Sequence, residues 1–220
     1  RIRGEMMRLL TAPDPAAVLT LMQGEKVLPH ILPEAKHFGR LRQLAWLEDK
    51  GLHMEGLERD PTRRLACLIE ADAKGALAIA ERFRLSNQDK KRLIALRKSQ
   101  HLQPALTLSK QERRQLIYRL GRETYFDLAL IAWAGERDID PRVPSASSSG
   151  WTQLLQQARA TQIPDFPLKG RDVLVLGVPH GPRVGELLEM VRQWWEEADF
   201  QPSPDACLER LKSRIESQIR

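Results

Sequence analysis

The 220-residue sequence has little of what β-rich, membrane-spanning or disulfide-bonded proteins require. Aromatic residues make up only 5% of the chain, whereas strands favour aromatic and β-branched side chains. The longest apolar run, Leu128 to Ala134, is far shorter than the roughly 20 residues of a transmembrane helix. The two cysteines, Cys67 and Cys207, are far apart and lack metal-ligand spacing, so we expect reduced thiols in a cytoplasmic protein. Cys67 lies in an apolar stretch and is predicted to be a core residue.

The sequence also lacks the common catalytic motifs. It has no glycine-rich phosphate loop, no His-Glu-x-x-His and no Gly-x-Ser-x-Gly, and its five histidines show no metal-ligand spacing. Asp138-Ile139-Asp140 has the spacing of a Mg²⁺-binding carboxylate pair, but its place at a predicted helix end favours a solvated turn. Glu48 and Asp49 are adjacent, and adjacent carboxylates on a helix diverge by about 100° and usually face water. We therefore predict no catalytic residue, metal ligand or cofactor for this chain.

Helix-start signals are frequent. Asp14-Pro15, Asp60-Pro61 and Ser203-Pro204 each place a capping side chain before a proline at the first helical position, and Ser86 and Ser109 begin capping-box patterns. Apolar residues after these signals recur with a 3.6-residue period. The pattern predicts an all-α protein, an irregular array of about ten helices in two or three subdomains. Only residues 172–176 read as a strand, and no partner strand is evident.

Domain boundaries are predicted from composition. Residues 141–150, with two prolines and a run of small polar residues, indicate a flexible linker. A softer boundary lies between residues 51 and 60. The expected parts are therefore residues 1–58, 59–140 and 151–220, with the linker at 141–150.

The positive charge is concentrated in the first half of the chain. Residues 1–110 hold 20 Lys and Arg against 13 Asp and Glu, a net charge of +7, whereas residues 111–220 hold 15 against 16. Several of the basic residues in the range 82–98 fall on one predicted helical side. Such a stripe can neutralise nucleic-acid phosphates, although a solvated helix face has the same pattern.

A second feature is a glycine-rich turn before a predicted helix. Gly177 and Gly181 suit tight turns, Pro182 suits the first position of a helix, and Gly185 would allow another backbone to approach closely. The free N–H groups at this helix start, with Arg183, could hold a phosphate; a plain corner between two helices is the competing interpretation.

Several segments, taken in order, resemble the neck, body and tail of bacterial tRNA nucleotidyltransferases (CCA-adding enzymes) and poly(A) polymerases. Arg1-Ile2-Arg3-Gly4-Glu5 resembles the Arg-Ile-x-x-Glu of the family's neck. The later segments similar to family motifs are Ile31-Leu32-Pro33-Glu34, Asp60 to Ala66, Leu85 to Asp89, Leu168 to Leu174 and Gly181 to Gly185. The resemblance covers nearly the whole chain. The family's nucleotide-selecting Glu-Asp-x-x-Arg motif is absent, because Glu48-Asp49 lacks the following arginine.

The resemblance implies an all-helical tRNA-binding portion whose catalytic head, with its Asp-x-Asp motif, Mg²⁺ ions and use of ATP or CTP, would precede Arg1. It makes residues 1–58 neck-like, residues 59–140 the body and residues 151–220 the tail. It does not separate CCA addition from poly(A) addition. Arg1 and Glu5 would lie at the junction with the head. The expected phosphate-contacting residues are Lys90, Lys91, Arg92, Arg97, Lys98, Arg63, Arg64, Lys169 and Arg183. The alternative is a helical protein-interaction module without a role in RNA binding.

Overall fold

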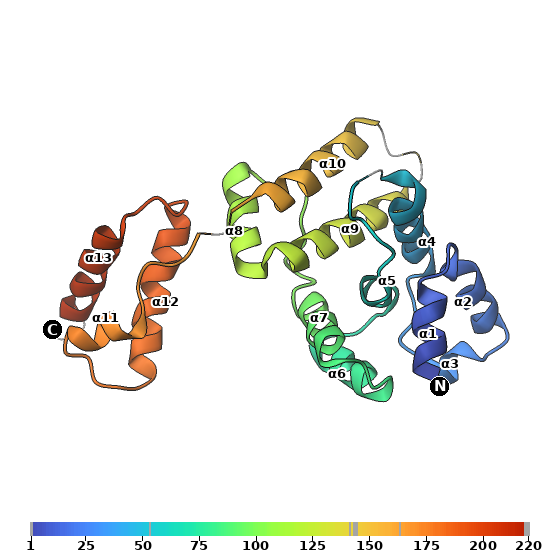
Figure 1. The fold of residues 1–220 in the computed structure, drawn as a ribbon, viewed down its shortest axis with the longest axis horizontal. Coiled ribbons are helices and arrows are strands. Elements are labelled where there is room, and N and C mark those ends of the chain that lie inside the picture. Colours follow the sequence, from blue (N-terminus) through green and yellow to red (C-terminus); the bar gives the residue numbers. More distant parts are fainter. Residues whose placement is uncertain (1, 53, 141, 143–144, 163, 218–220) are drawn as a thin grey trace. The chain divides into compact units, whose positions relative to one another are not determined.

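The protein is all-α, as the sequence predicts (Figure 1). The computed structural model describes residues 2–52, 54–140, 142, 145–162 and 164–217, and these contain thirteen α-helices, one π-helical turn and no strand. The elements are α1 (Ile2–Leu10), α2 (Pro15–Gly24), α3 (Leu28–Ile31), α4 (Phe38–Trp46), η1 (Leu47–Gly51), α5 (Pro61–Leu68), α6 (Ala73–Arg82), α7 (Asn87–Lys98), α8 (Lys110–Leu120), α9 (Arg122–Ile139), α10 (Ser145–Ala160), α11 (Gly170–Val175), α12 (Pro182–Glu197) and α13 (Pro204–Ser217).

The predicted capping residues begin the helices. Asp14 accepts a hydrogen bond from the Ala17 amide (3.1 Å) and Asp60 from the Arg63 amide (2.8 Å). Ser86 and Ser109 accept from the amides three residues later at 3.1 and 3.2 Å. Each bond satisfies an amide that the helix itself leaves without a partner, which is why these helix starts can be predicted from the sequence.

The chain divides into two compact units. The first comprises Arg1–Leu108 and Arg119–Thr161, and the second comprises Ser109–Tyr118 and Gln162–Arg220. In the first unit α9 packs against α4, α5, α7 and α10, and α6 pairs with α7. The apolar run Leu128 to Ala134 forms the middle of α9, where six of its seven residues are buried and Ala132 is half-buried. Cys67 is a fully buried core residue, as predicted.

The segment predicted as a flexible linker differs from expectation. Residues 141, 143 and 144 lie outside the described part, but α10 already begins at Ser145. Ser147 and Trp151 both donate hydrogen bonds to the carboxylate of Glu136 on α9, and the rings of Trp151 and Trp133 stack with centroids 6.3 Å apart. These contacts hold the serine-rich stretch as helix, so the prediction of a linker is wrong for Ser145 to Gly150.

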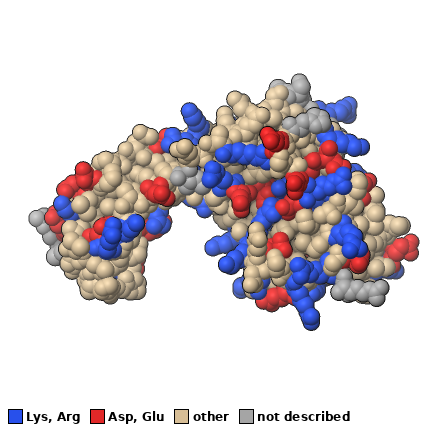
Figure 2. Space-filling view, viewed as in Figure 1, with Lys and Arg blue, Asp and Glu red and all other residues tan. Residues whose placement is uncertain are grey.

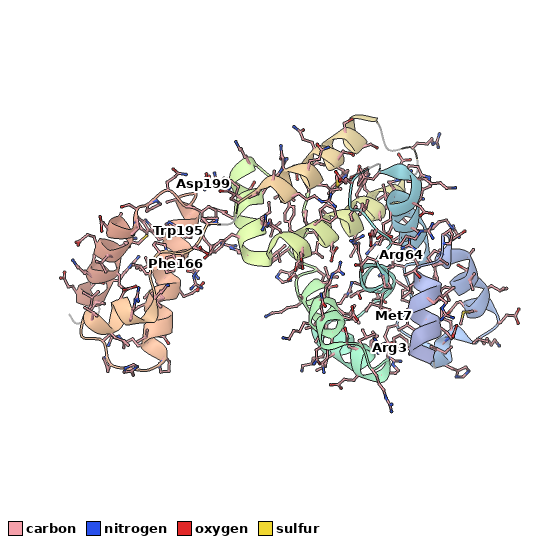
Figure 3. The ribbon with its side chains drawn as sticks, in the orientation of Figure 1. Arg3, Met7, Arg64, Phe166, Trp195 and Asp199 are labelled. Carbon is pink, nitrogen blue, oxygen red and sulfur yellow. The ribbon has the colours of Figure 1, made fainter. Side chains whose placement is uncertain are left out.

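The second unit has its own apolar core. Its buried members are Leu168, Val173, Val178, Leu187, Val191, Trp195, Cys207, Leu211 and Ile215. The rings of Tyr118, Phe166 and Phe200 pack against Trp195 with centroids 5.0 to 5.9 Å away. Figure 3 shows Phe166 beside Trp195. Residues 170–175, which include most of the strand-like segment, form α11 because Val173 is buried in this helical core. The open space around Gly185 contradicts the close backbone approach predicted there.

No helix in the described ranges combines the length and the apolar character needed to cross a lipid bilayer.

Candidate nucleic-acid interface

Six charged side chains form a network inside the first unit. Three are arginines and three are carboxylates, and they come from η1, the start of α5, α5 itself, α7 and α9. They are Glu48, Asp60, Arg63, Arg64, Arg92 and Asp127. We call this set the ion-pair cluster. Its core is buried, since Glu48, Arg63, Arg64 and Asp127 are between 0% and 6% exposed.

Each carboxylate of the cluster joins separate parts of the chain. Asp127 accepts from the Nε of Arg63 through Oδ1 at 2.7 Å and from the Nε of Arg92 through Oδ2 at 2.8 Å, which connects α5 and α7 to α9. Glu48 accepts from Arg63 and Arg64, one through each carboxylate oxygen, and so ties η1 to α5. The planar fork of arginine is suited to such shared carboxylates.

At Arg63, Arg92 and Asp60 the neighbouring groups outweigh the effect of burial on the pKa. Burial alone would lower the pKa of Arg63, but Asp127 and Glu48 outweigh it and raise that pKa above its ordinary value. Burial would likewise lower the pKa of Arg92, but Asp127 and Asp60 outweigh it and raise that pKa. For Asp60, burial is outweighed by the Arg63 amide and by the Arg63 and Arg92 guanidiniums, which leave its pKa below the ordinary 3.8. Glu48 differs, because burial outweighs the lowering effects of Arg63 and Arg64 and raises the pKa of its carboxyl. The ion pairs that join η1, α5, α7 and α9 make the cluster a structural joint.

Arg64 fastens the first helix to this joint (Figure 3). Its Nη1 donates to the carbonyls of Leu10 and Ala12, both at 2.7 Å, and Arg59 reaches the Thr11 carbonyl at 3.3 Å. The last carbonyls of a helix lack intrahelical partners and carry partial negative charge, so a buried cation there is favourable. Residues 2–10 are thus anchored to α5 at their C-terminal end.

A pocket of about 520 Å³ opens beside the ion-pair cluster. We call it the arginine pocket. It is lined by Gly56, Arg63, Gln88, Arg92, Arg122, Glu123, Phe126, Asp127, Ala158 and Arg159. Four arginines therefore face two carboxylates, and one of those carboxylates, Asp127, is already shared by Arg63 and Arg92. Figure 2 shows how closely basic and acidic side chains interleave on the visible face of the first unit.

Two arginines of the pocket have no carboxylate partner. Arg122, at the first position of α9, and Arg159, near the end of α10, are exposed, and neither makes an ion pair with any described residue. The guanidinium of Arg159 lies over the Phe126 ring, 4.6 Å from the centroid, and donates to the Glu55 carbonyl. These two cations remain available to an anionic ligand.

The basic stripe predicted on α7 is divided by the fold. Lys91 and Lys98 are exposed, lie seven residues apart on one side of the helix, and make no ion pair within the described chain. Lys90 pairs with Glu81 at 3.1 Å, and Arg92 belongs to the ion-pair cluster. Arg97 donates to the carbonyls of Ala71 (2.8 Å) and Ala66 (3.2 Å). Lys91 and Lys98 thus have the exposure that a phosphate contact requires.

The remaining predicted residues lie in different settings. Arg63 and Arg64, expected to contact RNA, are buried with internal partners, because α5 packs with both of them facing Glu48. Lys169 and Arg183 are exposed in the second unit, next to the starts of α11 and α12. Glu5 is exposed and pairs with Arg8 at 3.6 Å, and Arg1 lies outside the described residues.

Sequence reasoning missed Arg122, Arg159 and the cluster carboxylates. Asp127 left a signal, since a single carboxylate within the apolar run Tyr125-Phe126-Asp127-Leu128 predicts a buried cationic partner. No sequence pattern distinguished Glu48 from its neighbour Asp49. Adjacent carboxylates usually face water, yet Glu48 is buried, whereas Asp49 is half-exposed and pairs with Arg59.

Within the described ranges, no group of three or more His, Cys, Asp or Glu side chains could hold a metal ion.

No family model matches the chain. Partial similarities exist to individual proteins. A 73-residue stretch, 33% of the chain, is 38% identical to the "Uncharacterized 28 kDa protein in petA 5'region" of Rhodospirillum rubrum and covers 28% of it. A stretch of 82 residues, 34% of the chain, is 30% identical to "CCA tRNA nucleotidyltransferase 1, mitochondrial" of Homo sapiens and covers 19% of that protein. The protein of that name from Danio rerio is 36% identical over 62 residues, which is 28% of this chain and 14% of that protein.

The matched segments thus span between 14% and 28% of these relatives. The comparisons show that part of the chain is similar to part of a CCA tRNA nucleotidyltransferase.

Proposed function

We propose that this chain is an RNA-binding portion of a tRNA nucleotidyltransferase-related protein, and that it holds tRNA against the arginine pocket and the exposed side of α7. Nucleotide addition with ATP or CTP and Mg²⁺, to give CCA or A-tailed ends, is proposed for the whole protein and its catalytic head. The contribution of this chain is to position the RNA, which raises the rate by orientation rather than by bond-making.

One observation carries the proposal: Arg122 and Arg159 flank an open pocket without a carboxylate partner among the described residues, although neighbouring Arg63 and Arg92 are paired with carboxylates. An unpaired guanidinium is well suited to a phosphate, because its fork can donate two parallel hydrogen bonds. Lys91 follows Gln88, a pocket residue, by one turn of α7 and extends the positive surface along that helix. RNA helices are recognised mainly through such shape and phosphate contacts.

The partial similarity to CCA tRNA nucleotidyltransferases supports the choice of tRNA as the ligand. The excess of basic residues in the first half of the sequence agrees with an anionic partner.

A protein-interaction module is the second candidate. Val18 and Leu21 lie one turn apart on α2 and are 44% and 64% exposed, which is unusual for large apolar side chains on a helix. Such a pair favours a protein contact at α2. It does not explain why Arg122 and Arg159 lack a carboxylate partner among the described residues.

Fluorescence anisotropy with labelled tRNA tests the proposal. Arg122→Gln and Arg159→Gln should each weaken binding, whereas Lys74→Gln, which removes an exposed cation from α6, should leave the affinity nearly unchanged. Equal effects of all three variants would point to nonspecific charge attraction. No binding of tRNA at low salt would overturn the proposal and leave the protein-interaction module.

A further inference from the structure

A second pocket of the first unit lies on other residues. It has a volume of about 390 Å³ and is bounded by α4, α5, α7, α9 and the segment between α5 and α6. Its polar lining is formed by His37, Arg40, Glu70, Asp72, Arg97, Gln100 and Gln103, and its apolar wall includes Leu96, Leu128 and Ile131. We call it the α4–α7 pocket. It shares no residue with the arginine pocket.

Arg40 has unused hydrogen-bonding capacity in this pocket. Its Nε is buried, and no described group accepts a hydrogen bond from it. Its side chain also makes no ion pair with a described carboxylate, unlike Arg63 and Arg92 nearby in the fold. A buried donor without a partner is costly, so native proteins leave few of them.

The Arg40 side chain lies beside α9. A Cβ added to Gly135 of α9 would lie 3.4 Å from the Nε of Arg40 and 3.9 Å from its guanidinium carbon. The guanidinium of Arg40 therefore lies within van der Waals range of α9 at this position.

Arg97 is held in place but not neutralised. It is fixed by the carbonyls of Ala71 and Ala66, and these take only two of its five N–H donors. Of the two carboxylates in the lining, Asp72 caps α6 by accepting from the Gly75 amide at 2.8 Å, and Glu70 is exposed and makes no ion pair with a described residue.

The electrostatics of this pocket are the reverse of those in the ion-pair cluster. Burial, and next the charge of Arg40, lower the pKa of Arg97. Burial and Arg40 also lower the pKa of His37, against the opposing effects of Glu70 and Asp138. In the cluster, carboxylates raise the pKa values of Arg63 and Arg92. At Arg97 and His37, burial and the neighbouring cation outweigh the groups that act in the opposite direction.

We propose that the α4–α7 pocket binds a phosphate group, with Arg40 and Arg97 as its ligands. The volume accommodates a ligand of nucleotide size, and the amides of Gln100 and Gln103 are available to the part of the ligand beyond the phosphate. The phosphate can belong to a free nucleotide or to the backbone of an RNA strand. Because the residues differ, this site does not depend on the RNA surface proposed above.

Isothermal titration calorimetry with inorganic phosphate and with AMP tests the site on the full chain. Arg40→Gln should weaken binding about 10- to 100-fold, the usual effect of losing a charge-assisted hydrogen bond. Arg42→Gln is the matched control, since Arg42 is an exposed cation two residues along α4. Arg40→Lys, which retains the charge, should recover part of the affinity. Circular dichroism of each variant checks that the helices are intact.

The source of the phosphate is identified by the ligand whose affinity falls in Arg40→Gln. A loss of AMP affinity in Arg40→Gln identifies a free nucleotide; a loss confined to tRNA, with Arg122→Gln as comparison, identifies an RNA phosphate. If Arg40→Gln folds and binds phosphate, AMP and tRNA as the unaltered chain does, or if neither variant nor wild type binds any of them, the proposal is wrong.

Discussion

The guanidinium of Arg63 donates to the carboxylate of Asp127 at 2.7 Å across 64 positions of sequence, and the two side chains are only 7% and 2% exposed. Because Asp127 is also paired with Arg92, one carboxylate fixes the positions of α5 and α7 against α9. These are the helices that border both pockets of the first unit. The pair therefore sets the geometry on which both proposals depend.

Removal of Asp127 should destabilise the first unit severely. Asp127→Ala removes the carboxylate that Arg63 and Arg92 share and leaves them only Glu48 and Asp60, and removing one partner of a buried pair costs about 3–5 kcal/mol. Urea denaturation measures the loss. Glu25→Gln, which changes an exposed carboxylate after α2, should stay within about 0.5 kcal/mol of the unaltered chain. Similar stability of the two variants would contradict a structural role for the pair.

Substitution of Arg64 should release α1. Arg64→Met removes the donors to the Leu10 and Ala12 carbonyls while keeping an apolar side chain of similar length in the core. Amide hydrogen exchange of residues 2–10 should become faster. Arg59→Gln removes the longer, exposed bond to Thr11 together with the ion pair to Asp49, and should have a smaller effect on α1. Unchanged protection of α1 in Arg64→Met would show that apolar packing alone holds this helix.

The pKa of Asp60 predicts acid sensitivity. Its folded-state pKa lies below the ordinary 3.8, so its ionised form is stabilised by folding. This contribution is fully present above about pH 3.8 and is lost as the pH falls through the lower, folded-state value. Asp60→Asn retains the acceptor that caps α5 but removes the charge facing Arg92. This variant should be less stable at neutral pH and lose less on acidification; parallel pH profiles would contradict the prediction.

The thiols should be unreactive in the folded protein. Cys67 is fully buried, and burial raises its pKa to about 12; burial also raises the pKa of Cys207. Since the thiolate is the reactive form, Ellman's reagent should label neither cysteine until the chain is unfolded in urea. Rapid labelling of one thiol under native conditions would show that its surroundings open.

Local features of the fold were predictable from sequence, and long-range pairing was not. Asp14, Asp60 and Ser86 cap helices because their partners lie three residues away, and the apolar period gives the all-α class. Arg63 and Lys91 both appear as basic residues on predicted helices, yet one is buried and the other exposed. The difference is made by Glu48 and Asp127, whose proximity to Arg63 arises only when η1 and α9 pack against α5. Ser147 is likewise predicted to lie in a linker, because its hydrogen bond to Glu136 forms only when α10 packs against α9.

The salt dependence of tRNA binding tests the central claim most directly. The affinity should fall steeply between roughly 50 and 200 mM salt, as it does for a protein that releases counterions from phosphates. In a plot of the logarithm of affinity against that of salt concentration, Arg122→Gln should reduce the slope by about 1 and Lys74→Gln should not change it. A slope near zero for the unaltered chain, or the same slope for both variants, would contradict the claim that the arginine pocket holds RNA.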